Sequence, residues 1–89
     1  MKVESDKDFL ELRRHVTAWR KRFPMFEHDV KQIERIIENH ITNYSKHLVE
    51  HRRTHNKVHI ERAQQEIDSI NGILSTIGKL ELMAMLSQG

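Results

Sequence analysis

The sequence predicts an all-α fold in which three helices form one small bundle. Apolar residues recur at helical steps of three and four along most of the chain, and they divide into three stretches. Only three glycines and one proline occur in 89 residues, which argues against a turn-rich β fold. A chain of this length is expected to be a single domain spanning 1–89.

The first helix is predicted over about 6–22. Ser5 can cap it, and Asp6 and Asp8 suit the positive end of a helix. Pro24 ends it, because the residue before a proline is disfavoured in the helical region. One face carries the apolar residues Phe9, Leu12, Val16, Trp19 and Phe23.

The second and third helices are predicted over about 26–53 and 57–87, as the arms of a long antiparallel hairpin. The second apolar stripe ends at Leu48, and the third begins at Ile60, 12 positions later. In a continuous helix, Ile60 would therefore lie about 120° round the axis from the second stripe, which favours a turn between them. Thr54 and His55 are poor helix formers, and Asn56 can cap a new helix. The second stripe contains Phe26, Val30, Ile33, Ile37, Ile41, Tyr44 and Leu48, widened by Ile36; the third contains Ile60, Ala63, Ile67, Ile70, Leu74 and Ile77.

The sequence is also compatible with one alternative arrangement. Neither glycine nor proline interrupts the chain between 25 and 71, so a continuous helix over 26–86 is also compatible with the sequence. Such a helix would have to bury its stripe in a coiled-coil oligomer.

The first helix is expected to lie along the open end of the hairpin. Ser69, Gly72 and Thr76 form a row of small residues on which its large side chains could pack. A glycine inside a helix costs about 1 kcal/mol relative to alanine. We therefore expect close helix approach at Gly72 to compensate for that cost.

The formal net charge of +2 is unevenly distributed. Residues 1–24 carry seven Lys/Arg against four Asp/Glu and should pair with the acidic stretches 25–43 and 63–89. Residues 44–62 are also basic, with five Lys/Arg against two Glu, but have no such mate. They form either a solvated helix end or a contact for anions such as nucleic acid. The candidate residues are Lys46, Arg52, Arg53, Lys57 and Arg62.

Histidines recur every four residues through the same segment. His47, His51 and His55 are weak candidates for a divalent metal, because histidines at i and i+4 share a helix face. Further ligands would have to come from the other arm or another chain. The stretch 47–51 also fits H-x-x-E-H, but zinc peptidases need another acidic ligand and a substrate cleft, so we expect neither catalysis nor a cofactor.

The C-terminal stretch is apolar around the whole helix axis. A helix of that kind must be covered on every side, and a chain this small has little interior to offer. The cluster either closes the core with Phe23, Met25 and Phe26 or contacts another protein. The candidate interaction residues are Leu80, Leu82, Met83, Met85 and Leu86.

These patterns favour a non-enzymatic protein–protein interaction or assembly protein, an adaptor or accessory component that self-associates through its C-terminal end. A nucleic-acid-binding accessory protein that uses the basic segment 46–62 is the alternative. No stretch approaches the length of a membrane span, and acids occupy the first residues where a leader would be apolar. We therefore expect a cytoplasmic protein whose partner is a protein, a second copy or nucleic acid, with no small-molecule substrate.

Overall fold

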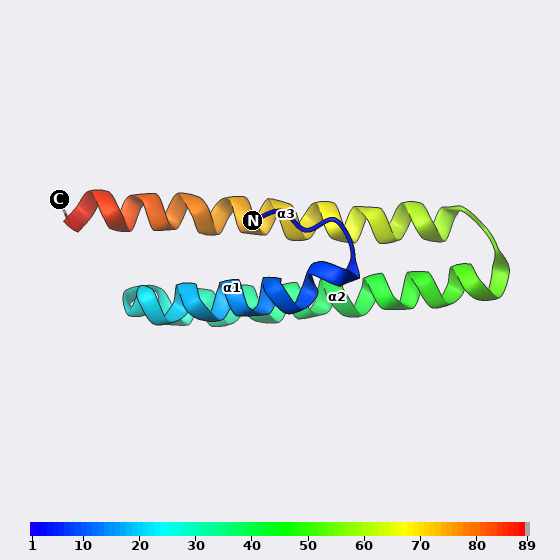
Figure 1. The fold of residues 1–89 in the computed structure, drawn as a ribbon, viewed down its shortest axis with the longest axis horizontal. Coiled ribbons are helices and arrows are strands. Elements are labelled where there is room, and N and C mark those ends of the chain that lie inside the picture. The colour runs from blue at the N-terminus through cyan, green and yellow to red at the C-terminus, as the bar shows by residue number, and fades with distance from the viewer. Residues whose placement is uncertain (89) are drawn as a thin grey trace.

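The computed structural model describes residues 1–88 and consists of three α-helices. They are α1 (Phe9–Arg22), α2 (Glu27–Thr54) and α3 (Val58–Gln88), with short 3₁₀ turns η1 (Asp6–Asp8) and η2 (Pro24–Phe26) before α1 and α2. α2 and α3 form an antiparallel pair, and α1 lies alongside α2 (Figure 1). The predicted three-helix bundle is confirmed. It is thin, with extents of 54 × 18 × 16 Å.

The turn between α2 and α3 excludes a continuous helix. Both helix ends lie within one residue of their predicted positions, at Thr54 and Val58. His55 adopts a left-handed conformation with φ of 56°, and its N–H donates to the His51 carbonyl at 2.7 Å. The Asn56 side-chain oxygen accepts the Val58 N–H at 3.1 Å. Asn56 thus caps the third helix, as the sequence indicates.

The other chain reversal lies at Pro24. The last α1 hydrogen bond runs from the Phe23 N–H to the Trp19 carbonyl, and Pro24 then begins η2. Proline fits this first position because it has no N–H to leave unpaired. Trp19 stacks on Phe26 across the reversal, with ring centroids 5.8 Å apart. The reversal directs α1 antiparallel to the first half of α2.

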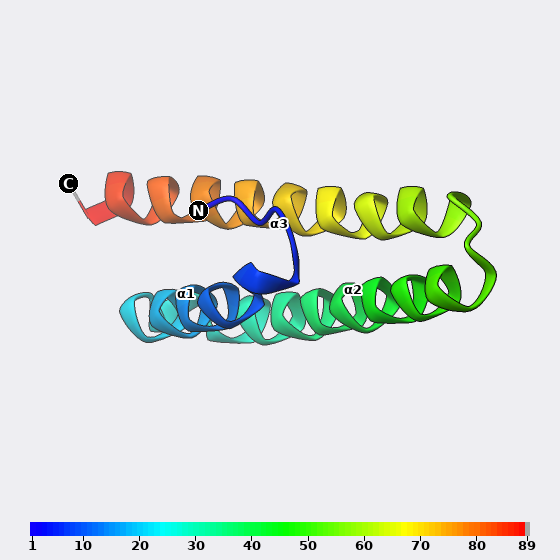
Figure 2. The ribbon, with the colours of Figure 1, turned by 45° about the vertical axis from the view of Figure 1, so that its right-hand side comes forward.

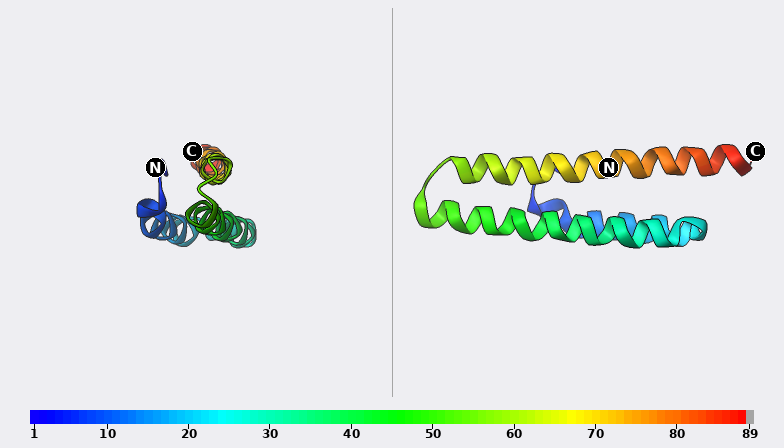
Figure 3. Two further views of the ribbon diagram at one scale, coloured as in Figure 1. Left: turned by 90° about the vertical axis from the view of Figure 1, so that its right-hand side faces the viewer. Right: turned by 180° about the vertical axis from the view of Figure 1, so that it is seen from behind.

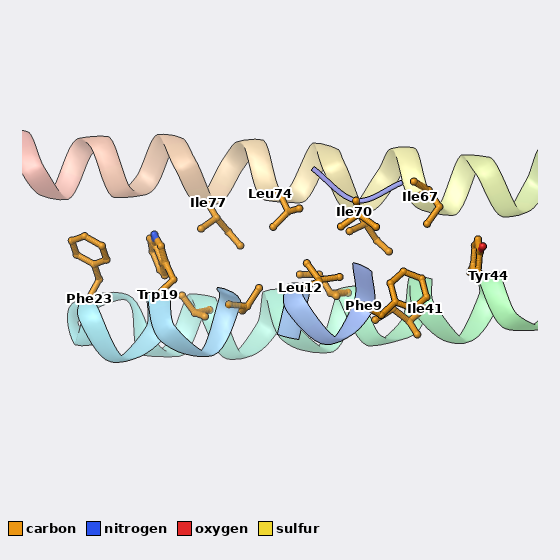
Figure 4. Close-up of a cluster of buried hydrophobic side chains, with 14 of the residues drawn as sticks. Phe9, Leu12, Trp19, Phe23, Ile41, Tyr44, Ile67, Ile70, Leu74 and Ile77 are labelled. Atoms are coloured by element: carbon orange, nitrogen blue, oxygen red, sulfur yellow. The ribbon is translucent and has the colours of Figure 1, made fainter. Parts of the chain in front are cut away.

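The core runs along the groove between α1, α2 and α3 (Figure 4). Most residues of the predicted stripes are buried there, and Phe9 meets Tyr44 edge-to-face at 5.3 Å. Ile36 and Ile60 do not follow the prediction, because 46% and 43% of their surfaces remain exposed. The buried set is Val3, Phe9, Leu12, Val16, Trp19, Phe23, Val30, Ile37, Ile41, Tyr44, Ala63, Ile67, Ile70, Leu74, Ile77 and Ala84.

The first residues of the chain form an extended segment that crosses from α1 to α3 (Figure 2). Val3 is fully buried, and the Asn71 side chain holds its backbone from both sides. The Val3 N–H donates to Asn71 Oδ1 and Asn71 Nδ2 donates to the Val3 carbonyl, both at 2.8 Å. This two-bond clamp closes the bundle beside α1.

The expected packing of α1 against the small-residue row is wrong. Ser69, Gly72 and Thr76 are all exposed, and a Cβ added at Gly72 would meet no atom within 4 Å. The buried residues of α3 lie about half a turn round from Gly72, so α1 and the N-terminal segment pack on another side. The row therefore faces solvent in this chain.

The left-handed residue in the α2–α3 turn leads to a prediction. His55→Gly should raise the free energy of unfolding by about 1 kcal/mol, because glycine adopts positive φ without the steric cost that a Cβ imposes. Urea denaturation at fixed protein concentration measures the change. Arg52→Gly is the control, since glycine at that exposed helical position should lower stability by about 1 kcal/mol. Equal losses in both variants would contradict the turn.

Candidate functional site

The structure divides the predicted C-terminal cluster into an inner and an outer part. Leu80 is half-buried against the core, and Ala84 is buried. The other four side chains are exposed: Leu82 by 57%, Met83 by 61%, Met85 by 52% and Leu86 by 73%. Met25, 60% exposed, belongs to the α1–α2 connection at the same end of the bundle (Figure 1). This apolar end comprises Met25, Leu82, Met83, Met85 and Leu86.

The basic residues of α1 pair with acidic residues of the hairpin, as the charge pattern predicts. Arg13 forms two hydrogen bonds to Glu38, at 2.7 and 3.0 Å. Arg20 contacts Glu34 at 3.2 Å, and Arg22 contacts Glu81 of α3 at 3.1 Å. The hydrogen bonds from Arg13 lower the pKa of Glu38, and the same contact raises the pKa of Arg13.

The second basic block lies at the turn end of the hairpin. Lys46, Arg52, Arg53, Lys57 and Arg62 are all exposed. Arg53 pairs with Glu50 at 2.6 Å, and this hydrogen bond lowers the pKa of Glu50. Among residues 1–88, the other four form no ion pair with an acidic side chain. Their charges are therefore directed to solvent.

The three histidines proposed as metal ligands have different surroundings. His47 is half-buried, with Nε2 lying 3.9 Å from Glu66 of α3. His51 Nδ1 lies 3.2 Å from the Asn56 carbonyl, and His55 is exposed in the turn. Across residues 1–88, no three His, Asp or Glu side chains are grouped so that they could hold a metal ion.

The hairpin has a second side, away from α1, that the sequence analysis did not single out. Eight half-buried side chains line it at seven-residue steps, and we call them the far seam. Glu66 lies at its middle and contacts His40 Nδ1 at 2.5 Å. Viewed along the bundle, no helix of residues 1–88 covers this side (Figure 3). The members are Phe26 from η2, Ile33, His40 and His47 from α2, and His59, Glu66, Ile73 and Leu80 from α3. Phe26 also stacks on Trp19.

The seven-residue spacing was readable in the sequence. Polar residues occupy half of the eight positions, however, so the spacing did not register as an apolar stripe. The contact between His40 and Glu66 brings the two sets of positions side by side in the folded hairpin.

No model of a known protein family, no curated protein and no solved structure matches this chain. Within residues 1–88, none of the helices has the length and apolar character needed to span a membrane.

The α1–α2 ion pair predicts a pH effect. Because the pKa of Glu38 lies below its ordinary value of 4.5, the pair stabilises the fold above that value. The stabilisation is lost as the pH falls through the lowered pKa of the folded protein. The stability difference between the wild type and Glu38→Gln should accordingly shrink over this acidic range.

NMR titration of the Glu38 carboxyl measures the pKa directly. Arg13→Met should return it towards 4.5, because the hydrogen bonds that lower it are removed. Arg14→Met is the control, since Arg14 pairs with Glu11 instead. A Glu38 pKa unchanged by Arg13→Met would contradict the assignment of the shift to this pair.

Proposed function

We propose that this protein is a non-enzymatic helical interaction protein, an adaptor or accessory component of an assembly, and that it self-associates through its apolar end. The observation that carries the proposal is the exposure of Leu82, Met83, Met85 and Leu86 on the last turns of α3. Cytoplasmic location is part of the proposal.

Two physical arguments support the apolar end as a contact surface. Large apolar side chains gathered at one place on a small chain are stabilised when another surface removes them from water. Methionine is unbranched and polarizable, so it fits partner surfaces of irregular shape. Met25, Met83 and Met85 supply three such side chains at this end.

The surroundings of the H-x-x-E-H residues support a role without catalysis. A zinc peptidase directs both histidines at one metal and the glutamate at its water. Here His47 is directed at Glu66, Glu50 pairs with Arg53, and His51 lies against the Asn56 carbonyl. The three side chains are thus engaged in three separate contacts.

The self-association proposal predicts the effect of charges at the apolar end. The wild type should sediment as an oligomer, and Met83→Glu/Met85→Glu should shift it towards monomer because carboxylates resist burial at an apolar contact. Analytical ultracentrifugation over a concentration series measures the shift. Methionine and glutamate have similar helix propensities, so α3 should stay folded.

Leu10→Glu provides the matched control. Leu10 is 58% exposed on the outer side of α1, far from the apolar end. This variant should keep the oligomer of the wild type. A wild type that stays monomeric at high concentration would refute self-association.

Nucleic-acid binding is the second candidate function, and the basic turn end favours it. Lys46, Arg52, Lys57 and Arg62 are exposed and form no ion pair within residues 1–88, so they are available to phosphates. Stacking partners are few, because Tyr44 is buried against Phe9. Binding would therefore be governed by charge rather than by bases.

Salt dependence tests this candidate. With about four phosphate contacts, affinity for duplex DNA should fall roughly a hundredfold between about 50 and about 200 mM salt. Arg52→Ala/Arg53→Ala should weaken binding and flatten the salt dependence, whereas Arg14→Ala/Lys21→Ala, which removes equal charge from α1, should not. Absence of binding at low salt would eliminate this function.

A further inference from the structure

We propose that two copies of this chain pack through the far seam, side by side and in parallel, so that α2 and α3 of each form a four-helix core. A two-fold axis along the hairpin would relate the copies. The inference rests on the proposed self-association and specifies its interface, because the far seam ends at Leu80, one helical turn before Met83 of the apolar end.

The side chains flanking the far seam point away from α1. Glu34 and Glu38 both pair with arginines of α1, and Ile36 lies midway between them. Each glutamate is about 200° round the helix from Ile36, so Ile36 is on the opposite side of α2. Within residues 1–88, 46% of the surface of this large apolar side chain, beside the far seam, is open to solvent.

This side of the hairpin carries little charge along its middle. Charged residues make up 31% of the chain, yet between Gln32 and Asn43 and between Gln65 and Thr76 it presents Glu66, with Asp68 at its outer edge one turn before Gly72. Glu66 is matched by His40 at 2.5 Å. Depletion of charge around apolar residues is characteristic of the centre of a protein interface. The uncharged residues are Gln32, Ile33, Ile36, Asn39, Asn43, Gln65, Ser69, Gly72, Ile73 and Thr76.

The two arms complement each other across the proposed axis. Glu66 lies against His40 and near His47, which aligns α2 with α3. In that register Asp29 is level with 77–84 and Glu50 with 56–63. A rotation about the long axis preserves these levels and brings α2 against the partner's α3. Asp29 then meets the partner's Lys79, and Glu50 meets the partner's Arg62.

The same rotation matches shape as well as charge. Ile36 is level with 70–77, where Gly72 and Thr76 leave open space on the outer side of α3. A protruding side chain on one arm therefore faces a row of small residues on the partner's other arm. This gives the exposed small-residue row of α3 a packing role that α1 does not provide.

A parallel arrangement is favoured over an antiparallel one. The far seam is apolar towards the open end, at Phe26, Ile33, Ile73 and Leu80, and polar towards the turn, at His40, His47, His59 and Glu66. Parallel packing places the apolar half of one far seam against the apolar half of the partner's far seam. Antiparallel packing would bury a carboxylate and histidines against isoleucine, which carries a desolvation penalty.

The first experiment measures the dimer dissociation constant by sedimentation equilibrium. Ile36→Glu should raise it roughly tenfold or more, the scale expected for a central apolar interface residue. Leu10→Glu, at a similarly exposed leucine of α1, should leave it unchanged. Circular dichroism should show unaltered helix content in both, because neither side chain is buried in the chain itself.

The second experiment tests the register between copies. Asp29→Lys and Lys79→Asp should each weaken self-association, because like charges then face each other twice per dimer. In an equimolar mixture both pairs are opposite again. Native mass spectrometry should find heterodimers above the one-half fraction that random exchange gives. Glu11→Lys mixed with Arg14→Glu, the same reversals on α1, should stay at that fraction.

The outcomes separate this interface from self-association in general. A wild type that dimerises, is insensitive to Ile36→Glu and is dissociated by Met83→Glu/Met85→Glu would refute the far-seam interface and keep self-association through the apolar end. Random mixing of the Asp29 and Lys79 variants would refute the parallel register. A monomeric wild type would refute both.

Discussion

The structure depends on how the apolar contact between the two long helices α2 and α3 is covered. α2 and α3 run for 28 and 31 residues, and two antiparallel helices alone leave the apolar residues between them open on both sides. α1 has only 14 residues and covers one side along the open half of the hairpin. The clamp between Val3 and Asn71 secures the start of that cover. Within residues 1–88, the far seam has no covering helix of this kind.

This imbalance explains the burial along the chain. Side chains at the junction of α1 with the hairpin, such as Leu12 of α1, Val30 of α2 and Ile70 of α3, are completely inaccessible to solvent. Residues of the far seam are half-buried, whether they are apolar like Ile73 or polar like His40. Ile36 is exposed because it lies on the side of α2 opposite α1, and Leu82, Met83, Met85 and Leu86 are exposed on the last turns of α3. One covering helix therefore separates the interior from the surfaces on which function is proposed.

Local signals in the sequence were enough for the helices and their ends. The proline at 24, the capping asparagine at 56 and the phase shift between Leu48 and Ile60 each act within a few residues, so the boundaries follow from them. The ion pairs of Arg13 and Arg20 with α2 followed from charge blocks, since they require only that oppositely charged segments lie together.

The side of α3 that faces α1 and the N-terminal segment could not be predicted from local sequence patterns, because it depends on contacts between residues far apart in the chain. Gly72 is solvent-exposed because Asn71, one position earlier, turns another face of α3 towards the N-terminal segment. The clamp joins residues 68 apart in sequence, and no local pattern marks either of them as a partner. The far seam could not be predicted for the same reason, because Glu66 is placed there by its contact with His40 on the other arm of the hairpin.

The polar half of the far seam bears on specificity more than on affinity. An interface built only from isoleucine and leucine would tolerate sliding and reversal of one copy against another. Paired polar residues permit a single alignment in which each buried charge keeps a partner, as polar core positions do in coiled coils. With His40 engaged by Glu66 in the same chain, the carboxylate enters a contact already paired. Any other alignment of the two copies would place His40 and Glu66 against the apolar half of the partner's far seam, and the desolvation penalty of that contact selects the parallel register.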